Sequence, residues 1–189
     1  MSKKNALLLT ASGYSDEELL YSYYRLTEDE FNIKICSDVI SSTQNPKPLK
    51  GINGLSLHSD YSYNDSFSKQ FFLENFNFLV LIGGVKSLEK IRQQRPIISF
   101  IKDWNEEGKV IASICHGTQL LIEADIIKDR KISGYYSIQK DIENAGATYS
   151  DQPAVVDNNI ISTAHYKHLG PWMKKALDVY YEKNFPKII

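Results

Sequence analysis

Cysteine is scarce in this chain of 189 residues, in which Cys36 and Cys115 are the only two. Two cysteines are too few for a disulfide framework, and free thiols are the rule in the cytoplasm. A domain of this length needs no covalent cross-link, because it buries roughly 70% of the surface of its unfolded chain. We therefore expect a cytoplasmic protein with reduced thiols.

An excess of one charge and a long apolar run are also missing. The chain has 22 basic and 23 acidic residues, which give a formal net charge of −1, and its basic residues form no stripe. The apolar run at residues 6–9 is too short for the core of a signal peptide, and no run approaches the length of a membrane span. We therefore expect neither nucleic acid nor a membrane as a partner.

Repeats, low-complexity tracts and linkers are absent as well, so we expect a single domain over residues 1–189. Strands are predicted at residues 6–11, 31–36, 76–82, 110–114, 131–133, 147–149, 154–156 and 160–163, with a hairpin at 51–59 and a loop at 41–48. Helices are predicted at residues 15–26, 87–92, 97–104, 118–124, 136–144 and 169–181. This alternation predicts an α/β fold, a three-layer α/β/α sandwich with a mainly parallel sheet.

The most informative stretch is Cys115-His116-Gly117, which joins a predicted buried strand to a predicted helix. This is the layout of a nucleophile elbow, which needs small residues two positions before and after its centre, and Ser113 and Gly117 stand there. A thiol at a helix N-terminus lies in a field that favours thiolate, so we interpret Cys115 as a nucleophile with a lowered pKa. The alternative is a structural cysteine at the end of an apolar strand, which is our interpretation of Cys36.

Two further signals lie at the carboxyl ends of predicted strands, where ligands bind in folds of this kind. Glu18 follows the first strand, and Gly83-Gly84 follow the third. Backbone N–H groups at paired glycines can face a reacting oxygen. Each signal also has a plainer interpretation. Ser15 and Glu18 have the spacing of a helix capping box, and the glycine pair is typical of a tight turn.

With these segments in view, the chain resembles the PfpI-type proteins of the DJ-1/PfpI superfamily, above all in the elbow at residues 112–121. The similarity runs nearly end to end and includes residues 7–11, 18–21, 81–84, 134–138, 142–147 and 155–157. The resemblance implies a flavodoxin-like fold related to class I glutamine amidotransferases. It also implies a homodimer or a larger homo-oligomer.

The resemblance assigns roles to individual residues. Cys115 would be the nucleophile, and a protonated Glu18 would donate a hydrogen bond to its thiolate and lower the cysteine pKa. The backbone N–H groups of Gly84 and His116 would form the oxyanion site, and the His116 side chain would act as general base or acid.

Glu89 matches, by its local context, a glutamate that a neighbouring subunit contributes to a Cys-His-Glu triad in PfpI-like oligomers. The alternative is a solvated helix face on which Glu89 pairs with Arg92 or Lys86. Both interpretations remain open from the sequence.

The chain departs from the family pattern in one segment near the pocket, where residues 162–168 replace the usual Ser-Arg-x-Pro-x-Asp and introduce His165 and His168. Loop histidines are more often solvated, which is our expectation for both, with pocket residues as the alternative. The two are too close together to define a metal site without further ligands. We expect no metal and no cofactor.

Together these features favour a cysteine-dependent, stress-linked enzyme that acts on a small reactive carbonyl compound, as a glyoxalase or deglycase. An intracellular cysteine peptidase or amidohydrolase is the alternative within the same chemistry. A redox sensor or chaperone that uses the oxidisable Cys115 is the alternative outside enzymology. The expected partners are therefore a small carbonyl or peptide substrate and further copies of the chain.

Overall fold

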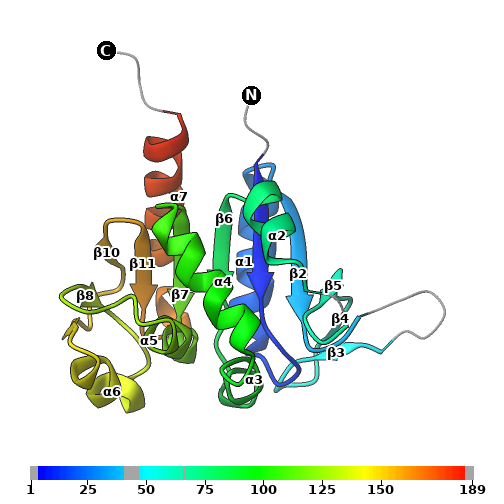
Figure 1. Cartoon of the computed structure of the whole chain (residues 1–189), viewed down its shortest axis with the longest axis horizontal. Coiled ribbons are helices and arrows are strands. Elements are labelled where there is room, and N and C mark those ends of the chain that lie inside the picture. Colours follow the sequence, from blue (N-terminus) through cyan, green and yellow to red (C-terminus); the bar gives the residue numbers. More distant parts are fainter. Residues whose placement is uncertain (1–3, 41–46, 66, 186–189) are drawn as a thin grey trace.

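The computed structural model describes residues 4–40, 47–65 and 67–185 (Figure 1). Within this part of the chain, seven strands form the central sheet, in the order β10-β11-β7-β6-β1-β2-β5. Their bounds are β1 Asn5–Leu9, β2 Asn32–Ser37, β5 Tyr61–Ser62, β6 Phe78–Leu81, β7 Val110–Ile114, β10 Val155–Asp157 and β11 Ile160–Thr163. All neighbours are parallel except β10 and β11, which confirms the predicted mainly parallel sheet.

Helices cover both faces of this sheet, as the alternation of strands and helices predicts (Figure 1). Helices α1 and α7 pack on one face, and α2, α3, α4 and α5 pack on the other. Their bounds are α1 Asp16–Glu28, α2 Lys69–Asn75, α3 Val85–Ile91, α4 Arg95–Glu106, α5 Gln119–Glu123, α6 Gln139–Asn144 and α7 Leu169–Asn184. The three-layer flavodoxin-like sandwich is thereby confirmed.

The central strands are buried on both faces, which explains their uninterrupted apolar sequences. In β1, Leu7 and Leu9 belong to the core beneath α2 to α5, whereas Ala6 and Leu8 belong to the core beneath α1 and α7. All four are fully buried. A strand with layers on both sides needs apolar residues at every position, not at alternate ones.

Two further pairs of short strands lie outside the main sheet. Strands β3 Leu49–Lys50 and β4 Ser56–Leu57 form the predicted hairpin, with Gly54 at a φ of 95° in its turn. Strands β8 Lys131–Ile132 and β9 Thr148–Tyr149 pair separately. Residues 41–46 of the predicted loop lie outside the described residues.

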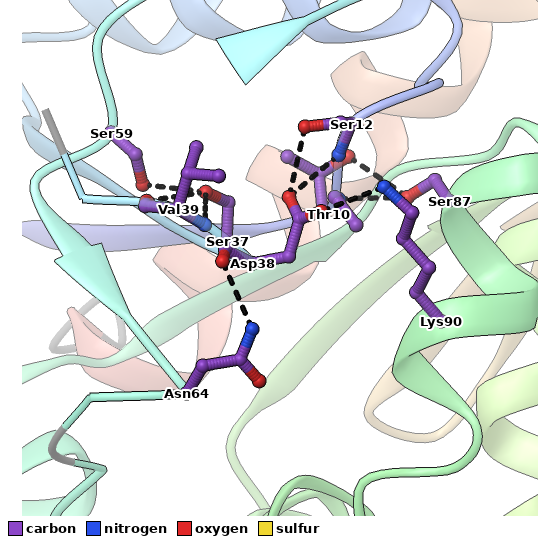
Figure 2. A network of polar contacts seen from close by, with 10 residues as sticks. Thr10, Ser12, Ser37, Asp38, Val39, Ser59, Asn64, Ser87 and Lys90 are labelled. Carbon is purple, nitrogen blue, oxygen red and sulfur yellow. Dashed lines mark hydrogen bonds and ion pairs between the residues drawn. The ribbon is translucent and has the colours of Figure 1, made fainter. Parts of the chain in front are cut away.

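A polar network joins helix α3 to the loops that follow β1 and β2, at the carboxyl edge of the sheet (Figure 2). The Ala11 N–H donates to Ser87 Oγ over 2.8 Å, and Ser12 N–H donates to Asp38 Oδ1 over 2.8 Å. Asp38 Oδ2 pairs with Lys90 Nζ at 2.7 Å. The network therefore fixes α3 to the loops that follow β1 and β2.

In the described part of the chain, no helix has both the length and the apolar character needed to cross a membrane.

Candidate active site

The predicted elbow is present at the end of β7. The chain reverses at Cys115, whose φ of 58° is a left-handed conformation that few non-glycine residues adopt, and a 3-10 helix runs over Cys115–Thr118. Both small residues are required by packing. Ser113 is fully buried, with its Oγ 2.8 Å from Thr118 Oγ1, and a Cβ on Gly117 would overlap the carbonyl oxygen of Leu81.

Three of the residues predicted for the site surround the sulfur of Cys115. His116 Nδ1 lies 3.4 Å from Cys115 Sγ. The backbone N–H groups of His116 and Gly84 are both directed at the sulfur, and the Glu18 carboxyl also hydrogen-bonds to it. These two donors favour negative charge at the sulfur, and the expected oxyanion site formed by the same N–H groups stays a prediction.

Glu18 serves this site and does not form the helix cap that the spacing offers as an alternative. Its side chain is 1% exposed, and its Oε2 accepts a hydrogen bond from Gly83 N–H over 2.8 Å. Ser15 has no side-chain cap hydrogen bond, and its N–H donates to the carbonyl of Gly83. The capping-box interpretation is therefore wrong, because Glu18 turns inward from α1 toward Cys115.

Burial raises the pKa of Glu18 to about 7, although hydrogen bonds from Gly83, Cys115 and Ser15 oppose the shift. The carboxyl is thus partly protonated near neutral pH.

Burial also raises the pKa of the Cys115 thiol, and the negative charge of Glu18 raises it further. The N–H groups of His116 and Gly84 act in the opposite direction but do not outweigh burial. The expected lowering of the Cys115 pKa is therefore wrong for this subunit. A neutral thiol at rest must lose its proton to a nearby base as it attacks.

His116 is placed to take that proton. It is only 9% exposed, its Nε2 lies 3.3 Å from Ser137 Oγ, and its ring stacks on Tyr135 at 4.8 Å between centroids. Burial lowers the pKa of His116, so the ring is neutral at neutral pH and its Nδ1 can accept a proton.

Cys115 opens into a pocket of about 420 Å³. The residues that line it come from the starts of α1 and α3, the β3–β4 turn, the elbow and two later loops. They are Ser15, Glu17, Glu18, Ile52, Asn53, Gly84, Val85, Cys115, His116, Tyr135, His165 and Tyr166. A pocket of this size accommodates a small organic molecule.

The pocket corrects one expectation about the histidines. His165 is half-buried and lines the pocket, with its ring 4.1 Å from that of Tyr166, so its assignment as a solvated residue is wrong. His168 lies outside the pocket at the start of α7. Sequence reasoning gave no role to Ile52, Asn53 or the two tyrosines. The resemblance covers residues 134–138 without pointing to a function for Tyr135.

Glu89 lies apart from the pocket within the subunit. It is exposed on α3 and pairs with Arg92 at 3.4 Å, one of the partners expected for a solvated helix face. Its role in a neighbouring subunit stays a prediction.

The described residues contain no group of three or more His, Cys, Asp or Glu side chains that could hold a metal ion. Cys36 is fully buried in the core, and burial raises its pKa to about 12, in agreement with a structural role. Of the two cysteines, only Cys115 lines the pocket.

Comparison with known proteins adds a family and a fold. The DJ-1/PfpI family matches residues 4–179. "Deglycase PfpI" of Pyrococcus furiosus is 33% identical over 169 residues, which cover 89% of this chain and 95% of that protein. YraA of Bacillus subtilis, named as a candidate cysteine protease, is 30% identical over 179 residues, which cover 95% of this chain and 99% of that protein. The solved structure of Schizosaccharomyces pombe DJ-1 shares the fold, with a TM-score of 0.80 at 18% identity over 96% of this chain and 98% of that one.

Proposed function

The chain belongs to the DJ-1/PfpI family, and from this membership we propose that it is a cysteine-dependent enzyme that converts small reactive carbonyl compounds, as a glyoxalase or deglycase does. One observation carries the proposal. The Cys115 sulfur lies 3.4 Å from His116 Nδ1 and faces two backbone N–H groups, in a pocket sized for a small molecule. This arrangement supports the assignment of a nucleophile, a base and an oxyanion site to these groups.

For methylglyoxal, the first step is attack of Cys115 Sγ on the aldehyde carbon. The thiol proton passes to His116 Nδ1. As negative charge develops on the aldehyde oxygen, this oxygen accepts hydrogen bonds from the N–H groups of Gly84 and His116. His116 then returns the proton to the oxygen, so the product of this step is a neutral hemithioacetal on Cys115 and His116 can again act as a base.

The second stage moves hydrogen between the two carbons of the substrate. The base removes the proton from the former aldehyde carbon, and a proton is returned to the neighbouring carbonyl carbon through an enediol. The aldehyde carbon is oxidised to a thioester as the ketone carbon is reduced to an alcohol, so no external oxidant is needed. Water then cleaves the thioester, releasing lactate and the free thiol.

The test is the rate of methylglyoxal loss and lactate formation by the protein without glutathione. We expect the Cys115→Ser variant to lose activity by about a thousandfold or more, because the nucleophile is removed. The matched control is Cys36→Ala, which removes the other cysteine from the core and should keep the activity of the folded protein. Lactate formation that survives the Cys115→Ser change would refute the proposal.

Amide hydrolysis is a second candidate, because a relative is named as a candidate cysteine protease and the same groups suit acyl transfer. The pocket of about 420 Å³ favours small carbonyl compounds over protein segments. Cleavage of a fluorogenic peptide by wild type but not by Cys115→Ser, without conversion of methylglyoxal, would support the peptidase instead.

A redox role is a third candidate, since the donors around Cys115 would also stabilise a sulfinate. His116 separates this role from catalysis. We expect His116→Ala to lower turnover by about a hundredfold or more, because the base is lost. Peroxide oxidation of Cys115, followed by mass spectrometry, should persist in that variant. Undiminished turnover would show that His116 is not the acid–base group.

A further inference from the structure

Glu17 contributes a carboxylate to the rim of the pocket. Its Oε1 accepts a hydrogen bond from Asn53 Nδ2 over 3.3 Å, and its Oε2 lies 3.5 Å from Ser15 Oγ. All three residues line the pocket. The negative charge of Glu17 is also one of the causes that raise the pKa of Glu18, although burial is the largest. The carboxylate therefore acts on the interior of the site.

The position of Glu17 is set by its neighbours. The Asp16 carboxylate accepts hydrogen bonds from the N–H groups of Asn53 and Leu55 over 2.9 and 2.8 Å, which fixes the β3–β4 turn against the start of α1. This contact holds the Asn53 amide beside Glu17. Glu17 takes part in none of the ion pairs found in the described residues, so its charge is available to a ligand.

Aromatic rings form another part of the pocket lining. The ring of His165 lies 4.1 Å from that of Tyr166 and 6.1 Å from that of Tyr135. Burial lowers the pKa of His165, as do the nearby Lys167 and His168, so its ring is neutral at neutral pH. Neither Lys nor Arg is among the described residues that line the pocket. A free carboxylate with aromatic faces is the combination that binds ammonium and guanidinium groups.

We propose that the pocket selects carbonyl compounds that carry a positive charge, on an ammonium or guanidinium group, and that Glu17 is the residue that determines this preference. The inference rests on the proposed function for the identity of the reacting group. The charge preference itself is a property of the pocket and can be measured at Cys115 without turnover.

The experiment compares two methanethiosulfonate reagents that differ in charge, the trimethylammonioethyl and the sulfonatoethyl compound. Each reacts with the cysteine to give a mixed disulfide and methanesulfinate, so the rate reports how readily each charge reaches Cys115. We expect wild type to react faster with the cationic reagent. The Glu17→Gln variant should lower the cation-to-anion rate ratio about fivefold, because one rim charge is removed. The ratio in wild type should also fall as salt is added.

The matched control is Glu28→Gln, which removes an exposed carboxylate from the last turn of the same helix α1, and it should leave the ratio unchanged. Cys115→Ser gives the background reaction of Cys36. A ratio that is equal in wild type and Glu17→Gln, or that is insensitive to salt, would overturn the inference.

The second arm measures turnover of two arylglyoxals with the same ring, one carrying a trimethylammoniomethyl group and the other its uncharged neopentyl isostere. Conversion to the mandelate consumes one water, as for methylglyoxal. We expect the ratio of the two turnover rates, cationic compound over neutral compound, to fall about fivefold in Glu17→Gln. If neither glyoxal is converted but the reagent ratio still depends on Glu17, the proposed function fails and the charge preference stands. If both glyoxals are converted without a preference that depends on Glu17, the proposed function stands and the charge preference fails.

Discussion

Glu18 is buried and Cys115 is half-buried, and these two acids are in hydrogen-bond contact, so each affects the charge of the other. Both cannot readily be ionised, because burial penalises each charge and the two charges repel. The two N–H groups at the sulfur favour negative charge there, and the N–H of Gly83 favours it on Glu18. The pair therefore holds at most one negative charge near neutral pH, and we expect Cys115 to pass its proton to His116 when Glu18 is protonated.

Glu18 should make folding stability depend on pH. Its pKa rises from 4.5 to about 7 on folding, so the stability it confers is complete below about pH 4.5 and is lost as the pH rises through about 7. We compare the free energies of unfolding of Glu18→Gln and wild type at two pH values. The difference in favour of Glu18→Gln should be about 2 kcal/mol larger at about pH 8 than at about pH 5. Urea unfolding at the two pH values measures this difference.

Glu28→Gln is the control for that comparison, because it removes an exposed carboxylate from the same helix. It should shift stability equally at both pH values. A stability difference between Glu18→Gln and wild type that did not change with pH would contradict the raised pKa.

At the scale of the element, the elbow depends on a close approach between the chain that follows β7 and the end of β6. Gly117 leaves no room for a side chain, because a Cβ would overlap the backbone carbonyl oxygen of Leu81, which cannot move without disturbing β6. We expect Gly117→Ala to destabilise the protein by about 2 kcal/mol or more. Thermal or urea unfolding checks this.

Gly170 provides the matched control. In α7 its nearest neighbour is the Tyr21 hydroxyl, 3.9 Å from an added Cβ, which is ordinary contact. Gly170→Ala should be neutral or stabilising by less than about 1 kcal/mol, because alanine favours helix. Equal effects at the two glycines would refute the packing argument for the elbow.

Gly84, whose N–H is the second proposed oxyanion donor, stands at the start of helix α3, so we expect the position of α3 to affect catalysis as well as folding. Ser87 is fully buried, and its Oγ accepts the Ala11 N–H and contacts Thr10 Oγ1 at 3.3 Å. We expect Ser87→Ala to cost about 1–3 kcal/mol, since a buried N–H loses its partner. It should also lower kcat with little change in KM, because displacement of the Gly84 N–H affects the transition state.

Two variants test whether that effect belongs to the hydrogen bond. Ser87→Thr keeps the hydroxyl and should restore much of kcat. Ser99→Ala, on the exposed side of α4, should change neither the free energy of unfolding nor kcat. Lost stability with an unchanged kcat would reduce Ser87 to a structural role.

At the scale of the whole molecule, Glu89 is exposed and does not line the pocket of its own chain. Its predicted role is therefore one in the site of a neighbouring subunit. If Glu89→Ala and Cys115→Ser are each inactive, co-refolding the two should regain about a quarter of wild-type activity in a dimer, because half of the dimers are mixed and each holds one intact site. Methylglyoxal conversion measures this.

The same variants refolded separately and then mixed briefly are the control for that experiment. No activity after co-refolding, with mixed assemblies demonstrated by mass spectrometry, would exclude sharing of Glu89 between subunits. An active Glu89→Ala variant would exclude a catalytic role altogether.

The sequence by itself determined the layers and most of the sheet, and it identified the candidate nucleophile. The apolar strand patterns and helix patterns are local signals that repeat along the chain, so the alternation that predicts a parallel α/β sandwich can be found without knowing any contact. The elbow is also local, because small residues around Cys115 are demanded by a single turn. Even Glu18 and Gly84 could be found, since each follows a buried strand and such ends meet at one edge.

Only the tertiary structure decided the state of the site and the walls of its pocket. The raised pKa of Cys115 and the inward turn of Glu18 follow from burial by segments far apart in the chain, which no local pattern records. The wall formed by Asn53 and His165 depends on how the β3–β4 turn and the loop after β11 fold back over the sheet. Loop positions are set by long-range packing, so the chain's own periodicity carries no information about them.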